Sequence, residues 1–166
     1  MVVELGTKLA PSILSANMAH LSDQILEINH AGADYIHIDI MDGHFVPTLT
    51  FGPLIVEAIR PLTTLPLDVH LMVENPTNLI PEFARAGADI LTVHAEASIN
   101  LSSTIQQIKD HGARAGVALK PLTPLTAVEE CITELDLLLV MTVNPGYPAQ
   151  TFIESTLSKI QQARHM

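Results

Sequence analysis

Six short apolar segments recur along this chain, and segments of helical character separate them. They predict strands over 8–15, 35–42, 67–73, 90–95, 114–120 and 137–143, because short runs rich in Val, Ile and Leu favour strands. Strands that are apolar on both faces are typical of a parallel sheet covered on each side. The chain is therefore expected to have an α/β fold built from repeated βα units.

Helices are predicted between and after these strands, over 19–31, 53–61, 77–87, 99–111, 125–135 and 150–165. Three glycines, Gly32, Gly87 and Gly112, occur in similar contexts shortly before predicted strands. Glycine readily adopts the left-handed conformation that ends a helix. The recurrence of this signal supports a repeated βα unit.

The repeat predicts a (β/α)8 or TIM barrel of which about six βα units are present. Such barrels rarely have fewer than about 200 residues, so residues 1–166 are expected to form one barrel domain that lacks the last two units. The alternative, an open doubly wound sheet, normally carries a glycine-rich phosphate loop after its first strand. Residues 11–16 contain no glycine. The first and last predicted strands, 8–15 and 137–143, would each leave an unpaired edge that favours association, and a homo-oligomer is expected.

Composition limits the partners and the compartment. The chain has 8 Lys and Arg against 18 Asp and Glu, a net charge of −10, which argues against nucleic acid and anionic membranes as partners. No apolar run approaches the roughly 18 residues of a membrane helix, and residues 1–5 do not resemble the start of a secretion signal. A single cysteine, Cys131, favours a reducing compartment. We expect a cytoplasmic protein.

Two predicted strands carry polar residues in an alternating pattern. His37, Asp39 and Met41 share one face of the strand over 35–42, because side chains alternate along a strand. Burying an imidazole and a carboxylate is costly unless they are paired or bind a metal. The pattern alone is therefore compatible with a structural His–Asp pair or with a metal site.

The strand over 67–73 repeats the pattern, with His70 and Met72 on one face. Two histidines and a carboxylate from adjacent strands, at the end of a barrel where catalysis occurs, suit Zn²⁺, Fe²⁺ or Mn²⁺. Met41, Met72 and Met141 either fill the core or line the site. His94 either supports the site or packs in the core or at a dimer contact.

Four segments together resemble the ribulose-phosphate 3-epimerase family. They are 11–15, 37–47, 67–73 and 141–146, and the likeness runs in order from about residue 8 to 160. The resemblance implies a (β/α)8 barrel isomerase of the pentose phosphate pathway that interconverts D-ribulose 5-phosphate and D-xylulose 5-phosphate. It also implies a bound divalent metal ion, for which we expect Zn²⁺ ahead of Fe²⁺, Mn²⁺ or Co²⁺.

The resemblance also implies roles for individual residues. The metal ligands would be His37, Asp39 and His70, and Asp39 would also be one of two acid/base carboxylates. The implied substrate-binding positions are Ser12, Met41, His70, Met72, Met141 and Gly146. Inverting a carbon beside a ketone requires one group to remove a proton and another to return one on the opposite face. The carboxylates that flank the sugar would serve these two roles.

The sequence departs from the family pattern in two places. The second acid/base carboxylate, which the family carries on its seventh strand, is absent, so the 166-residue chain alone is expected to be impaired. The loop over 147–149 reads Tyr-Pro-Ala where the family is glycine-rich, and an altered phosphate grip is expected. Two alternatives stay open: a 3-epimerase of a ketohexose 6-phosphate such as allulose 6-phosphate, and a non-catalytic remnant that binds a partner through exposed edge strands.

Overall fold

The computed structural model describes residues 6–166, so the prediction for residues 1–5 lies outside the described residues. Five parallel strands form one sheet in the order β1-β2-β3-β4-β5. Their bounds are Ile36–Met41 for β1, Leu67–Met72 for β2, Ile90–His94 for β3, Arg114–Leu119 for β4 and Leu137–Val140 for β5. Each strand pairs with its neighbours in sequence, as expected when successive βα units are laid side by side.

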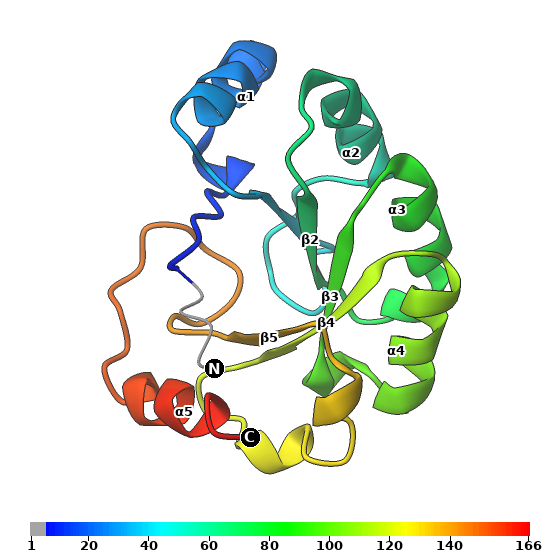
Figure 1. Ribbon diagram of the computed structural model, residues 1–166, viewed down its shortest axis with the longest axis vertical. Coiled ribbons are helices and arrows are strands. Elements are labelled where there is room, and N and C mark those ends of the chain that lie inside the picture. Colours follow the sequence, from blue (N-terminus) through cyan, green and yellow to red (C-terminus); the bar gives the residue numbers. More distant parts are fainter. Residues whose placement is uncertain (1–5) are drawn as a thin grey trace.

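Within the described residues, five α-helices lie around the outside of the curled sheet (Figure 1). They are α1 (Leu21–His30), α2 (Pro53–Ile59), α3 (Ile80–Ala86), α4 (Leu101–Asp110) and α5 (Thr156–Ala163). The main core lies between these two layers, where the outward side chains of the strands, such as Ile38, Val69 and Val117, are fully buried. The other face of the strands is therefore left to line the inside of the curl.

The predicted glycine signal at helix ends is confirmed. Gly32, Gly87 and Gly112 all have positive φ, and Gly87 caps the end of α3 at φ 106°. A Cβ on Gly87 would come within 2.7 Å of the Arg60 side chain. Arg60 in turn pairs with Asp89 at 2.7 Å, just before β3. The glycine thus lets the chain turn tightly over the Arg60 side chain, which links the end of α2 to the start of β3 through Asp89.

The predicted strand over 8–15 is wrong. Within residues 6–166 it forms one isolated parallel bridge, between Ser12 and His37, and residues 13–15 form a 3-10 turn. Pro11 has no N–H to donate, and the Ser12 side chain accepts a hydrogen bond from the Leu14 N–H at 3.1 Å, which starts the turn. The segment is extended beside β1 but does not extend the sheet as a strand.

Two helix predictions also need correction. Residues 125–135 form two 3-10 turns, Leu125–Ala127 and Ile132–Glu134, in a segment where β-branched residues crowd a helical backbone. The helix predicted over 150–165 begins only at Thr156, because the Ile153 N–H donates to the carbonyl of Thr142 at 2.8 Å. Within residues 6–166, every helix is too short or too polar to span a bilayer.

Candidate active site

The inward face of the sheet opens into a cleft of about 320 Å³ at the carboxyl ends of the strands. Strand register brings the polar residues together there: Asp39 on β1 pairs with His70 on β2, and His37 pairs with Asp68. All eight side chains or loop residues predicted from the sequence line this cleft, namely Ser12, His37, Asp39, Met41, His70, Met72, Met141 and Gly146. The structure therefore gathers the predicted positions into one place.

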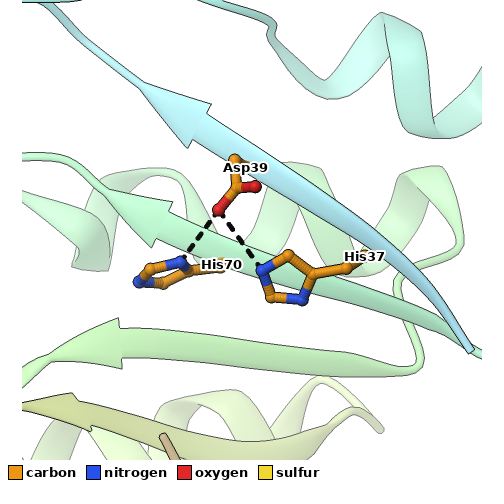
Figure 2. A group of neighbouring side chains, drawn as sticks. All are labelled: His37, Asp39 and His70. Atoms are coloured by element: carbon orange, nitrogen blue, oxygen red, sulfur yellow. Dashed lines mark hydrogen bonds and ion pairs between the residues drawn. The ribbon is translucent and has the colours of Figure 1, made fainter. Parts of the chain in front are cut away.

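His37, Asp39 and His70 converge on one point (Figure 2). Oδ1 of Asp39 lies 3.3 Å from Nε2 of His37 and 3.1 Å from Nδ1 of His70. One donor atom from each residue lies within 4.8 Å of the other two. His70 is 1% exposed, and the other two side chains are 15% exposed or less. Two imidazoles and one carboxylate thus lie together with little of their surface exposed to solvent.

The chemistry of this donor set fits a divalent metal ion. Nδ1 of His37 donates to Oδ2 of Asp68 at 2.7 Å, so in the neutral imidazole Nε2 carries a lone pair toward Asp39. A carboxylate that holds the far nitrogen of a ligating histidine in this way is the usual outer partner of a metal site. Two nitrogens and one oxygen suit Zn²⁺, Fe²⁺, Mn²⁺ or Co²⁺. The residues therefore present electron pairs where a cation would need them.

The pKa values show how the site is charged without a metal. Burial alone would lower the pKa of His37, but hydrogen bonds to Asp39 and Asp68 outweigh it and raise the pKa to about 10. Burial would raise the pKa of Asp39, yet its hydrogen bond with His37 is the largest opposing influence, and the pKa is held well below its ordinary value. Burial lowers the pKa of His70 to about 4. A proton on His37 therefore stands where a metal would bind.

A second row of polar residues supports His70. Nε2 of His70 lies 3.0 Å from Nε2 of His94, which is fully buried at the end of β3. Nδ1 of His94 lies 2.9 Å from Oε2 of Glu96, in the 3-10 turn after β3. The sequence left His94 open between a supporting and a packing role, and it did not single out Glu96. The only available signal was the two-residue spacing of His94 and Glu96.

Ser12 and the methionines complete the wall of the cleft. Oγ of Ser12 donates to Oδ2 of Asp39 at 2.6 Å, so both carboxylate oxygens of Asp39 are held. Met41 and Met72 are each 2% exposed and form a small apolar cluster with Val46. They line the cleft and also pack together, so the two predicted roles of the methionines coexist.

The loop after β5 closes one side of the cleft. Gly146 has φ 118°, and a Cβ there would come within 3.1 Å of Val46. Thr48 donates to the carbonyl of Gly146 at 2.6 Å. Ala149 adopts φ 56°, a left-handed conformation that glycine accepts more readily. The loop thus keeps a left-handed turn with alanine in that position.

Comparison with known proteins finds a matching family model and relatives that are identical to this chain at more than half of the aligned residues. A family model described as the ribulose-phosphate 3 epimerase family matches residues 8–166. Ribulose-phosphate 3-epimerase of Bacillus subtilis is 59% identical over 96% of this chain, which spans 73% of that protein. The chloroplastic ribulose-5-phosphate-3-epimerase of Arabidopsis thaliana is 54% identical over 95% of the chain. The chain spans 57% of the plant protein's length.

Solved structures with low sequence identity share the fold. The tryptophan synthase alpha-subunit of Pyrococcus furiosus aligns with a TM-score of 0.67 at 13% identity, over 93% of this chain and 71% of the other. A Yersinia pestis dihydropteroate synthase aligns with a TM-score of 0.63 at 15% identity, over 95% of this chain and 67% of the other. These similarities confirm the predicted barrel type of α/β fold.

Proposed function

The chain belongs to the ribulose-phosphate 3 epimerase family, and from that premise we propose that it takes part in interconverting D-ribulose 5-phosphate and D-xylulose 5-phosphate. In this proposal the chain supplies the metal ligands and one acid/base group. The supporting observation is the convergence of one donor atom each from His37, Asp39 and His70 to within 4.8 Å, at the edge of a cleft.

Asp39 is proposed to move the proton at C3 of the sugar. Its lowered pKa keeps the carboxylate ionised and therefore unprotonated, and Ser12 donates a hydrogen bond to its second oxygen. Proton removal beside the ketone gives an ene-diolate, and a group on the opposite face must return a proton to invert the centre. Following the family resemblance, we assign that second group to the part of the relatives' length that this chain does not span.

His37, Asp39 and His70 are the residues that would hold the metal, for which we propose Zn²⁺. When bound, a divalent ion supplies Lewis-acid stabilisation of the oxygen that becomes negative. Met41, Met72 and Met141 are proposed to cover the sugar and to exclude water from the charged intermediate. In this proposal the two histidines and Asp39 would hold the metal ion, and the methionines would shield the charged intermediate from water.

The substrate phosphate is proposed to lie against the loop after β5. Gly146 and the residues up to Gln150 line the cleft beside Met141. Backbone N–H groups bind phosphate without a positive side chain, which suits a chain with a net charge of −10. Pro148 has no N–H to contribute, so this loop offers one donor fewer than a glycine-rich loop.

Three wider assignments also belong to this proposal. Residues 1–166 are proposed to form a single barrel domain, with the last two βα units in the part of the relatives that this chain does not span. We propose a cytoplasmic enzyme that acts on a small sugar phosphate. We propose a homo-oligomer, whose state sedimentation equilibrium would measure.

Deuterium exchange tests the catalytic proposal. The 166-residue chain, with its length verified by intact mass, is incubated with Zn²⁺ and D-ribulose 5-phosphate in D₂O. Asp39 acting on one face should introduce deuterium at C3 while little xylulose 5-phosphate forms. Asp39→Asn should abolish the exchange, and Glu82→Gln, at an exposed position on α3, should retain it. Absence of exchange in the unaltered protein would contradict the proposal.

Two further measurements separate the alternatives. Comparing C3 exchange on ribulose 5-phosphate and on allulose 6-phosphate distinguishes pentose from hexose specificity, to which the altered loop over 147–149 is relevant. Titration with Zn²⁺ distinguishes an enzyme from a remnant that only binds a partner. A remnant would bind no divalent metal tightly, and His70→Ala would change nothing.

A further inference from the structure

We infer that Glu96, acting through His94, is a positioning residue that fixes which nitrogen of His70 carries the proton. The inference rests on the proposed metal site, because it concerns the lone pair that His70 presents to that site. It assigns a role to two residues that neither contact the cleft nor belong to the three proposed ligands.

The contacts form an unbroken line from the surface to Asp39. Oε2 of Glu96 lies 2.9 Å from Nδ1 of His94, and Nε2 of His94 lies 3.0 Å from Nε2 of His70. Nδ1 of His70 then lies 3.1 Å from Oδ1 of Asp39. His94 is 0% exposed and His70 is 1% exposed. Water therefore has little access to the two imidazoles, and each must satisfy its nitrogens within this line.

The carboxylate of Glu96 sets the direction of the line. An ionised carboxylate only accepts hydrogen bonds, so Nδ1 of His94 must donate to it. In neutral His94, Nε2 then carries a lone pair and accepts the Nε2–H of His70. Neutral His70 is left with its lone pair on Nδ1, aimed at Asp39. That lone pair faces Oδ1 of Asp39 at 3.1 Å, and a bound cation would relieve the repulsion between the two.

The surroundings prevent the line from rearranging. The other oxygen of Glu96, Oε1, accepts the Lys120 N–H at 2.8 Å and also the hydroxyl of Thr123. Lys159 on α5 donates to three carbonyls of the same loop, those of Lys120, Pro121 and Thr123. The ring of Phe45 packs 4.7 Å from that of His94. Both carboxylate oxygens of Glu96 are therefore engaged, Oε1 by the loop over 120–123 and Oε2 by His94.

Replacing Glu96 with glutamine should reverse the donor and acceptor roles in the hydrogen bonds that lead through His94 to His70. The backbone N–H of Lys120 is a fixed donor, so the amide oxygen of the glutamine must face it and the amide NH₂ must face His94. His94 then accepts at Nδ1 and donates from Nε2 to His70. His70 in turn carries its proton on Nδ1, where the metal would bind. Glu96→Gln thus preserves size and hydrogen-bond count but blocks the ligand atom, whereas Glu96→Asp keeps a carboxylate.

Imidazole nitrogen NMR on the metal-free wild-type protein tests the direction without any variant. Two-bond proton–nitrogen correlations should show neutral His94 protonated at Nδ1 and neutral His70 protonated at Nε2. Finding His70 protonated at Nδ1 in the wild type would overturn the inference. This measurement depends neither on catalytic activity nor on metal binding.

Zinc affinity, measured by competition with a chromophoric chelator, tests the consequence. Glu96→Gln should weaken Zn²⁺ binding by about 10- to 100-fold, the usual cost of losing an outer partner, and Glu96→Asp should recover most of the affinity. Glu82→Gln is the matched control, and thermal unfolding verifies that each variant is folded. Equal affinity for wild type and Glu96→Gln, or equal loss in both Glu96 variants, would overturn the inference. A wild type that binds no Zn²⁺ would instead contradict the proposed metal site. The imidazole nitrogen shifts would still test the direction of the hydrogen bonds from Glu96 through His94 to His70.

Discussion

His37 and His70 face the same carboxylate oxygen, but different routes support them from behind. Nδ1 of His37 contacts the carboxylate of Asp68 directly at 2.7 Å. Nε2 of His70 reaches Glu96 only through His94. The front of the site is nearly symmetric, with distances to Asp39 of 3.3 and 3.1 Å, while its support is not.

Strand register explains the difference. His37 pairs with Asp68 on the neighbouring strand, so an acceptor lies directly beside it. His70 pairs with Thr92, which is buried and provides no acceptor to it, and the supporting imidazole comes from two residues further along β3. The short route, from His37 to Asp68, therefore depends on the sheet alone; the long route runs from His70 through His94 to Glu96. The long route ends outside the sheet and depends on the loop over 120–123.

Asp39→Asn removes the point where both routes meet and should have the largest effect. It replaces the carboxylate that contacts both His37 and His70 with an uncharged amide. Loss of a residue that only supports a ligand costs up to about 100-fold in metal affinity, and the loss of Zn²⁺ affinity in Asp39→Asn should be greater. Chelator competition measures the affinity. Asp110→Asn, at an exposed position in α4, should bind Zn²⁺ like the wild type. Retained affinity in Asp39→Asn would show that the two routes do not converge on a metal.

The pH dependence of metal-free stability should separate the two histidines next. The pKa of His37 is raised from 6.5 to about 10, so its stabilisation is complete below about pH 6.5 and is lost as the pH rises toward about 10. The pKa of Asp39 is lowered, so its contribution is present above about pH 4 and is lost on acidification. The pKa of His70 is lowered from 6.5 to about 4, so its burial destabilises the folded state increasingly as the pH falls below about 6.5. Thermal unfolding with chelator present should therefore show maximum stability near about pH 6.5.

A variant at His37 checks the origin of the alkaline loss. His37→Gln should flatten the stability profile between about pH 6.5 and 10, because the group that gains stability from its proton is gone. His30→Gln, at an exposed position in α1, should keep the wild-type profile. An unchanged alkaline limb in His37→Gln would contradict the assignment.

Alternation along strands was enough to predict the front of the site, because it places His37, Asp39 and His70 on inward positions whatever the register. The support behind them depends on register and loop structure. Asp68 lies deeper than His70 on its strand, but the sequence does not show that it pairs with His37. Glu96 lies in a 3-10 turn beyond a strand, where no periodic pattern applies.

The first predicted strand failed for a related reason. Residues 8–15 have the composition of a strand, but strand formation also requires a continuous ladder of backbone partners. In residues 6–166 that segment has one bridge, at Ser12. Its polar contact with Asp39 was nevertheless consistent with the predicted position of Ser12 in the site.

Asp68→Asn sharpens the comparison between the routes. Among the described residues, Oδ1 of Asp68 has no hydrogen-bond partner, so no fixed donor dictates how an asparagine amide would orient. The amide oxygen is free to face His37 and preserve the direction of the short route. Zn²⁺ affinity should therefore fall by about tenfold or less, the lower end for outer partners, and by less than in Glu96→Gln. A greater loss in Asp68→Asn would show that charge, rather than hydrogen-bond direction, governs the support.

Thr123→Val should have the smallest effect, because it removes only one of two donors to Oε1 of Glu96. The Lys120 N–H remains and still fixes the orientation of the carboxylate. Loss of a single hydrogen bond costs about 1 kcal/mol, so Zn²⁺ affinity should fall by roughly fivefold at most, and His70 should keep its proton on Nε2. Thr126→Val, in the neighbouring 3-10 turn, is the matched control. If Thr123→Val weakened Zn²⁺ binding as much as Glu96→Gln, the long route would depend on the rigidity of its loop and not on the direction of its hydrogen bonds.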